Sequence, residues 1–143
     1  MLFRSLAGLV LEASDQASTV HGCNVIAQVA ATAALTKAQD WLNEFLLHLQ
    51  AMRNLTVRAL NAMPGVKCHM PQGCYVAFAD ISETGFTAEQ IRDKWYTEAR
   101  VSVVPGLPRW FGSRAGNHIR ISFATSENIL TEAFSRINTS MNA

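Results

Sequence analysis

The chain has 143 residues, the size of one domain, and a formal net charge of +1. Acidic and basic residues are interspersed, so no basic stripe points to nucleic acid and no charged tail points to a membrane surface. The early apolar run at residues 6–11 is far too short to span a bilayer.

The hydrophobic share of the chain is high for a small domain. Residues of this class make up 49% of the sequence, and the mean hydropathy is slightly positive. A small domain of this kind exposes part of its apolar surface unless something covers it. We therefore expect one face to be covered by another domain or by a partner subunit.

The amino-terminal part of the chain predicts helices. Residues 2–13 carry apolar side chains at helical spacing, and a polar, turn-rich linker follows up to Asn24. An alanine-rich, tightly packed helix is expected over residues 24–35. Asp40 is the expected N-cap of a longer helix, whose apolar stripe ends at Met63-Pro64-Gly65 because proline and glycine stop helices.

The remainder of the chain predicts alternating strands and helices. Strands are expected at residues 66–69, 74–80, 101–104 and 118–123, the first two joined by a turn at residues 70–73. Thr87 and Gln90 form a capping box for one helix, which runs to Ala99, and Ser126 caps a final helix that runs to Ile137. Residues 107–116, rich in glycine and proline, are expected to form an ordered loop.

This order of elements predicts an α/β (α+β) fold. We expect a two-layer sandwich in which helices cover one face of a small, mostly antiparallel sheet, preceded by a long helix. Residues 1–23 form an amino-terminal helix and linker in this prediction, and residues 24–143 form the domain itself.

Cysteine and histidine usage gives no metal site. Cys23, Cys68 and Cys74 have no metal-ligand spacing, and the four histidines lie far apart in the sequence. The three cysteines are interpreted as reduced core residues of a cytoplasmic protein.

The strand at residues 118–123 carries the main candidate for ligand binding. Its alternation points Ile119, Ile121 and Phe123 to one face and Arg120 to the other, between His118 and Ser122. If that second face meets water, Arg120 is an ordinary solvated residue. If it lines a cleft, the guanidinium offers a planar fork of donors that matches a carboxylate.

Residues 24–137 resemble the carboxy-terminal part of class I/II aminotransferases, the aspartate-aminotransferase-like group of pyridoxal-phosphate-dependent enzymes of fold type I. Five pieces match in the family's order. They are the alanine-rich segment 26–30, the helix with Met52-Arg53 and Leu60 that ends at 63–65, the strand entry 71–75, the loop with Pro105-Gly106, Phe111-Gly112 and Gly116, and the strand 119–124.

The resemblance implies an amino-group transfer between an amino acid and a 2-oxo acid. It assigns Arg120 to the substrate α-carboxylate and places Tyr75 near the substrate. Arg109 is a further candidate carboxylate ligand, although residues 107–110 make this loop longer than the usual family spacing.

The resemblance places the Schiff-base lysine and the other groups that hold pyridoxal phosphate upstream of this segment. Lys37, Lys67 and Lys94 lack the family's sequence context, so we expect no catalytic, cofactor-binding or metal-binding residue in the chain. Pyridoxal phosphate would belong to the parent enzyme, and the fragment alone would be inactive, since the cofactor carries the chemistry.

Partners and alternatives follow from the same resemblance. Expected partners are the large domain, which residues 1–23 would contact, a second copy in a homodimer, and the amino acid or 2-oxo acid substrate. A lyase or synthase of the same fold is an alternative function. Others are an aminotransferase-like effector domain of a transcription regulator and a self-associating interaction module.

Overall fold

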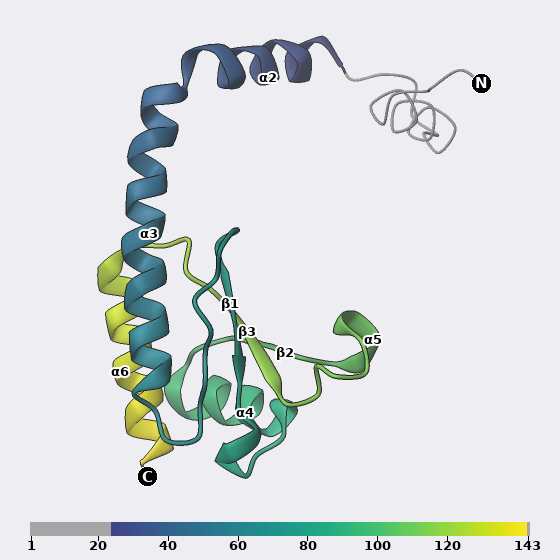
Figure 1. Cartoon of the computed structure of the whole chain (residues 1–143), viewed down its shortest axis with the longest axis vertical. Helices are drawn as coiled ribbons and strands as arrows, with labels where there is room; N and C mark the ends of the chain where they lie inside the picture. The colour runs from purple at the N-terminus through teal and green to yellow at the C-terminus, as the bar shows by residue number, and fades with distance from the viewer. Residues whose placement is uncertain (1–23, 143) are drawn as a thin grey trace, which may run out of the picture. The chain divides into compact units, whose positions relative to one another are not determined.

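The structure is a computed structural model that describes residues 24–142. The chain divides into a first unit that ends at Leu42 and a second unit that begins at Asn43 and contains the sheet. The elements, labelled in Figure 1, are α2 (Val25–Lys37), α3 (Gln39–Asn61), β1 (Val76–Asp80), α4 (Ala88–Lys94), β2 (Val104–Pro105), α5 (Pro108–Phe111), β3 (His118–Ser122) and α6 (Glu127–Met141). The helix and linker predicted for residues 1–23 lie outside the described residues.

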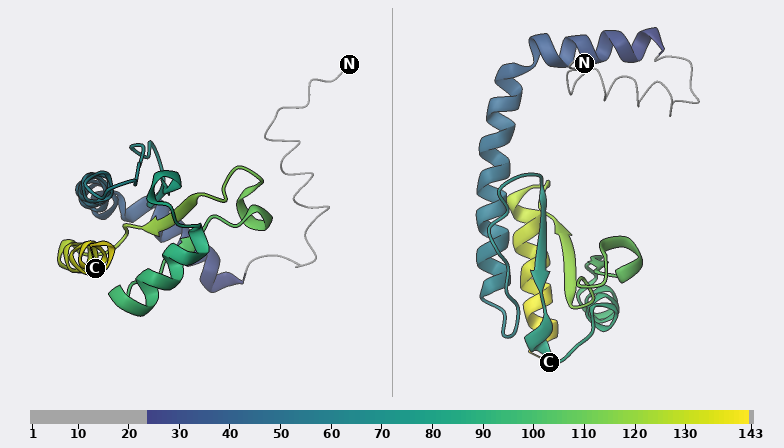
Figure 2. Two further views of the ribbon diagram at one scale, coloured as in Figure 1. Left: turned by 90° about the horizontal axis from the view of Figure 1, so that it is seen from below. Right: turned by 45° about the vertical axis from the view of Figure 1, so that its right-hand side comes forward.

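Three antiparallel strands in the order β1-β3-β2 form the sheet. β3 is the central strand. Toward β1, its Ile119 pairs with Ala79 and its Ile121 with Ala77, and toward β2 its Arg120 pairs with Val104. Figure 2 shows α3 and α6 along one side of these strands, with the short α5 on another side. The predicted α/β fold with a small antiparallel sheet is confirmed.

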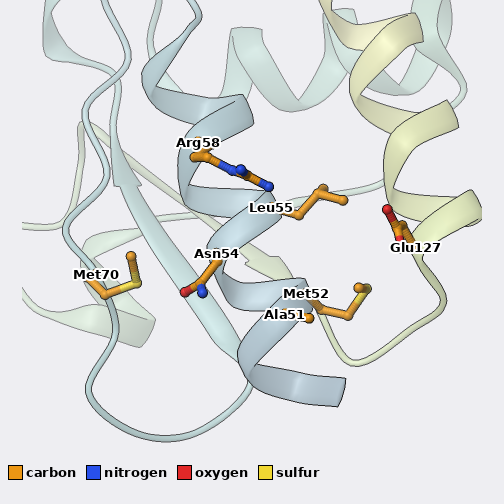
Figure 3. Close-up of a pocket in the computed structure, with 7 residues that line it drawn as sticks. All are labelled: Ala51, Met52, Asn54, Leu55, Arg58, Met70 and Glu127. Atoms are coloured by element: carbon orange, nitrogen blue, oxygen red, sulfur yellow. The ribbon is translucent and has the colours of Figure 1, made fainter. Parts of the chain in front are cut away.

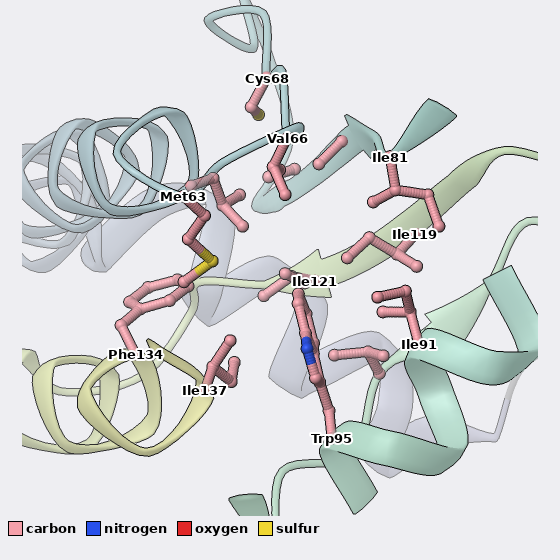
Figure 4. Packing of buried hydrophobic residues seen from close by; sticks show 14 of the residues in the cluster. Met63, Val66, Cys68, Ile81, Ile91, Trp95, Ile119, Ile121, Phe134 and Ile137 are labelled. Carbon is pink, nitrogen blue, oxygen red and sulfur yellow. The ribbon is translucent and has the colours of Figure 1, made fainter. Parts of the chain in front are cut away.

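One continuous core joins the sheet to the helices. Ile119 and Phe123 of the β3 region are almost fully buried together with Trp95, and Leu60 and Ile137 supply the contribution of α3 and α6. Figure 4 shows the Trp95 indole between the strand residues and the carboxy-terminal helix. Full burial of one large apolar side chain stabilises a fold by about 1.5–3 kcal/mol, so this cluster fixes which face of the sheet turns inward.

In the first unit, the prediction of a tightly packed helix is wrong. α2 begins after the N-cap Asn24, whose side chain accepts a hydrogen bond from the Ala27 N–H at 2.8 Å. The helix was expected to be tightly packed, but every one of its residues is exposed. Alanine favours helix formation whether or not the helix is covered, so composition predicted the helix and not its burial.

α3 begins at Gln39, so the predicted N-cap Asp40 lies inside its first turn. A carboxylate is favourable there as well, because it faces the positive end of the helix dipole. The apolar stripe is buried only in the second half of the helix, at Met52, Val57 and Leu60. Trp41 remains 63% exposed.

The strand predicted at residues 66–69 is reduced to a single bridge between Lys67 and Asp80. Asn61, the last residue of α3, explains why: its side chain accepts a hydrogen bond from the Cys68 N–H at 2.8 Å and donates to the Cys68 carbonyl at 3.0 Å. These bonds satisfy the backbone of Cys68 without a neighbouring strand.

The capping box of Thr87 and Gln90 is present at the start of α4. The helix continues as a π turn over Trp95–Ala99 and ends at Arg100 in the left-handed conformation, with φ of 58°. The Val101 N–H bonds back to the Trp95 carbonyl at 3.0 Å, so it is not free for a strand. β2 is therefore shorter than the predicted strand at residues 101–104.

The loop predicted at residues 107–116 contains the short helix α5. Pro108 is its first residue, a position where proline is favourable because the missing N–H is not needed. The base of this segment is closed by two backbone hydrogen bonds, from Gly106 N–H to the His118 carbonyl at 2.7 Å and from His118 N–H to the Ala115 carbonyl at 2.9 Å. The segment is thus anchored to the beginning of β3.

Ser126 caps α6 as predicted, and the helix runs to Met141, beyond the expected end at Ile137. Ser140 lies in this extension and is buried, with its hydroxyl donating to the Ile137 carbonyl at 2.9 Å. Within residues 24–142, no helix has the length and apolar character needed to cross a membrane.

Replacing Asn61 with Ala removes both side-chain bonds to the backbone of the buried Cys68. We expect the free energy of unfolding to fall by about 1–2 kcal/mol, measured by urea denaturation. Asn128→Ala, at an exposed position of α6, is the matched control and should change it by less than about 0.5 kcal/mol. Equal effects of the two changes would contradict the role of Asn61.

Replacing Gly106 with Ala places a methyl group against the base of the α5 segment. Its Cβ would collide with the Ala115 carbonyl oxygen and lie 2.7 Å from the His118 carbonyl oxygen. We expect a loss of about 1–3 kcal/mol in the free energy of unfolding, measured by thermal denaturation. Gly116→Ala, in the same segment but facing open space, is the control; a Gly106→Ala protein as stable as this control would refute the close packing.

Candidate functional site

The candidate site lies on the sheet face that turns away from the core, which we call the open face. Along β3, burial alternates as the sequence predicts, with Ile119 and Ile121 buried and Arg120 exposed. The strand register brings together on the open face Val76 with Ser122, Phe78 with Arg120, Asp80 with His118, and Val104 with Arg120.

Arg120 stands in the middle of this face, on the central strand. Within residues 24–142, its guanidinium makes no hydrogen bond or salt bridge. A hollow of about 430 Å³, the Arg120 hollow, opens beside it. The hollow is lined by Cys74, Tyr75, Val76, Ser102, Val103, Val104, Arg120 and Ser122. The unpaired donors of the guanidinium are therefore available to an anion.

Tyr75 lines the same hollow and is 54% exposed. Its carbonyl accepts a hydrogen bond from the Phe123 N–H at 2.9 Å, which continues the pairing of β1 with β3 past the end of the strands. This hydrogen bond places Tyr75 at the edge of the Arg120 hollow. A position of Tyr75 near the substrate stays a prediction.

Cys74 corrects the interpretation of the cysteines as core residues. Cys68 is buried, and burial raises the pKa of its thiol, which disfavours the reactive thiolate. Cys74 is exposed, lines the Arg120 hollow and has a left-handed backbone with φ of 61°. Cys23 lies outside the described residues.

Arg109 lies on α5 and does not line the Arg120 hollow. Its guanidinium stacks over the ring of Trp110, with Cζ 4.7 Å from the ring centroid. Both side chains belong to the segment that the sequence analysis marked as longer than usual for the family. A role of Arg109 in carboxylate binding stays a prediction.

The sequence pattern gives no sign of an aromatic cluster on the open face. Phe78 stacks on His118 with ring centroids 4.8 Å apart, and it also contacts Phe111 of α5 at 5.4 Å. These three residues are called the aromatic stack below. The alternation of β1 places Phe78 outward, but only the strand register reveals that it faces Arg120.

Asp80 brings a negative charge to the edge of the open face. Hydrogen bonding from the Ser82 backbone N–H, at 2.8 Å, is the main reason that the pKa of its carboxyl lies below the ordinary value. The charge of His118, which faces Asp80 across the strands, lowers this pKa further. Asp80 is thus held ionised at neutral pH by the turn that follows β1.

No lysine is among the residues that line the Arg120 hollow. Lys67 forms a salt bridge with Glu83, and Lys94 forms one with Glu98 at 2.8 Å. The hydrogen bond with Glu83 raises the pKa of Lys67, which disfavours the neutral amine that a Schiff base requires. Lys37 belongs to α2, in the other unit. The described residues therefore do not fit a pyridoxal phosphate site by themselves.

Another hollow, of about 550 Å³, lies in the second unit (Figure 3). Its lining residues are Ala51, Met52, Asn54, Leu55, Arg58, Met70 and Glu127, none of which the sequence analysis predicted to bind a ligand. Among the described residues, no group of three or more His, Cys, Asp or Glu side chains is placed to hold a metal ion.

Comparison with known proteins gives sequence relatives over most of the chain. An aspartate aminotransferase from Pyrococcus horikoshii is 36% identical over 112 residues, which are 77% of this chain and 28% of the relative. A Mycobacterium tuberculosis protein, provisionally named a cystathionine beta-lyase, is 34% identical over 136 residues, which cover 85% of this chain and 33% of the relative.

Solved structures agree with the sequence relatives. An alanine aminotransferase from Pyrococcus furiosus superposes with a TM-score of 0.81 at 31% identity, covering 96% of this chain and 35% of that one. No protein-family model matches the chain. The chain spans about a third or less of the length of the curated relatives it matches. These matches place the chain in the class I/II, aspartate-aminotransferase-like family of pyridoxal-phosphate-dependent enzymes of fold type I, with a coverage consistent with the carboxy-terminal small domain.

Proposed function

We propose that this chain is the small domain of a pyridoxal-phosphate-dependent aminotransferase, in which Arg120 binds the α-carboxylate of an amino acid or 2-oxo acid. The observation that carries this proposal is the exposed guanidinium of Arg120 beside a hollow, without an anionic partner among the described residues. An arginine kept only for stability would gain from a nearby carboxylate, whereas a binding arginine must keep its donors free.

The geometry of the Arg120 hollow supports a carboxylate as the ligand. Tyr75 and Val104 give it an apolar wall, while Ser122 lies next to Arg120 along the same face. A charged hydrogen bond is stronger beside such apolar surface than in open water, because less solvent competes for the donors. Arg120 would fix the substrate by its carboxylate, and Tyr75 would limit its movement.

The cofactor belongs to the parent enzyme in this proposal. Pyridoxal phosphate, when bound, supplies the electron sink for amino-group transfer. No lysine lines the hollow beside Arg120, so the large domain would hold the cofactor. That large domain is also the partner we propose for the exposed aromatic residues of the open face, and a second copy completes a homodimer.

A lyase reaction on the same fold is a second candidate, since the Mycobacterium tuberculosis relative carries that provisional name at 34% identity. In both candidate reactions, this chain would have the same role, which is to orient the substrate carboxylate. They differ in what happens to the substrate afterwards, and a choice between them requires a substrate test.

The isolated chain should not retain pyridoxal phosphate. After incubation with the cofactor and desalting, we expect no absorbance from bound pyridoxal phosphate and no amino-group transfer, because Lys67 and Lys94 are paired with carboxylates and no lysine lines the hollow. Stoichiometric cofactor attached to a single lysine, mapped by mass spectrometry, would show instead that this chain contains a cofactor site.

The role of Arg120 can be tested in a chimera. Residues 24–143 would replace the matching segment of the Pyrococcus horikoshii aspartate aminotransferase, and amino transfer and β-elimination would be assayed with a panel of amino acids. Loss of a charged hydrogen-bonding group is worth about 1.5–3 kcal/mol, so Arg120→Gln should reduce kcat/KM at least about tenfold. Arg120→Lys should recover only part of this loss, because an ammonium group lacks the planar fork.

Arg114→Gln is the matched control, since Arg114 is exposed in the segment before β3 and does not line the Arg120 hollow. Cofactor absorbance and cooperative unfolding would show that each chimera is assembled. An assembled chimera whose kcat/KM is as insensitive to Arg120→Gln as to Arg114→Gln would refute the carboxylate role.

A further inference from the structure

The guanidinium of Arg120 lies close to an aromatic ring outside its own sheet. Its Cζ lies over the ring of Phe111, 5.8 Å from the ring centroid. This is within the range at which a cation and an aromatic face attract each other. Phe111 is the last residue of α5, so the contact joins the α5 segment to the central strand.

Phe111 is held in place by the rest of the aromatic stack. Its ring contacts Phe78 at 5.4 Å, and Phe78 in turn stacks on His118 at 4.8 Å with an interplanar angle of 14°. Phe78 also faces Arg120 directly across the pairing of β1 with β3. Arg120 therefore has Phe78 of β1 as its strand partner and Phe111 of α5 beside its guanidinium.

The backbone of the α5 segment makes this arrangement stable. The hydrogen bonds at its base tie Gly106 and Ala115 to His118, two residues before Arg120. Gly106 is buried against these carbonyl groups, where a side chain would not fit. The position of Phe111 is thus set by the same strand that carries Arg120.

We propose that Phe111 is a positioning residue that holds the Arg120 guanidinium toward its hollow. This inference rests on the proposed function, because it is for a substrate carboxylate that the orientation matters. A long arginine side chain on an exposed strand loses rotamer freedom when it binds an anion. Contact with an aromatic face removes part of that freedom beforehand and leaves the N–H donors at the edge of the guanidinium free.

The contact between Phe111 and Arg120 also suggests a role for the longer loop at residues 107–110. Residues 107–110 precede Phe111, and Pro108 starts the helical turn that carries it. Trp110, the neighbouring aromatic residue, holds Arg109 instead. The two adjacent rings of α5 therefore contact two different arginines, which provides a matched pair of substitutions.

The test uses nuclear magnetic resonance of the full 143-residue chain. The Nε–Hε signal of Arg120, assigned by its disappearance in Arg120→Lys, reports both the ring contact and anion binding. In Phe111→Leu we expect this signal to shift toward that of a solvated arginine. The affinity for pyruvate, used as the carboxylate probe, should fall about two- to fivefold, the size of an exposed cation–π contact. Phe111→Tyr, which keeps an aromatic ring, should leave both the Arg120 signal and the pyruvate affinity close to those of the original chain.

Trp110→Leu is the control, because it removes a ring from α5 without touching Arg120; it should move the Arg109 signal and leave that of Arg120 in place. Phe111 is 37% exposed and outside the core, so Phe111→Leu should fold, and Phe111→Met offers a second ringless variant. If folded ringless variants keep the Arg120 signal and the pyruvate affinity of the original chain, the positioning role is overturned.

Failure of the proposed function has a different signature. If pyruvate leaves the Arg120 signal of the original chain unmoved while that of Phe111→Leu is shifted, the ring contact is supported and the carboxylate role of Arg120 fails. If pyruvate moves the Arg120 signal equally in the original chain and in Phe111→Leu, the carboxylate role is supported and the positioning role of Phe111 fails.

Discussion

The pairing of β3 with a strand on each side is the constraint on which the rest of the structure depends. Because successive side chains of a strand point to opposite faces, the register assigns Ile119 and Ile121 to the core and Arg120 to the open face in one step. A slip of one residue would bury the guanidinium and expose both isoleucines. Burial of each isoleucine is worth about 1.5–3 kcal/mol, so the core itself enforces the presentation of Arg120.

The two faces of the sheet differ in burial and in the kind of side chain they carry. The inner face is closed by Trp95 and by residues of α3 and α6, which form one cluster with the strands (Figure 4). The open face leaves Arg120 and the ring of Phe78 exposed, and the exposed Phe111 ring of α5 contacts Phe78. Such a surface is unfavourable for an isolated domain and favourable for one that closes against another domain around a small ligand. This asymmetry agrees with the family to which the chain belongs.

Two conformational irregularities of the second unit lie next to the strands that flank Arg120. The π turn at Trp95–Ala99 inserts the indole into the core and ends α4 before β2 begins. Cys74, with its left-handed backbone, directs the chain into β1 at the edge of the Arg120 hollow. Both features set where a strand starts, and β1 and β2 are the two strands that flank Arg120.

The sequence by itself determined the elements whose signals are local. Capping at Thr87 and Ser126 and the alternation of β3 needed only neighbouring residues, because side-chain hydrogen bonds and strand geometry act over a few positions. Tertiary structure decided the rest. The exposure of α2 depends on what covers the helix, which no local pattern encodes. The pairing of Asn61 with Cys68 and the contacts among Phe78, Phe111 and Arg120 likewise depend on how separate segments pack together.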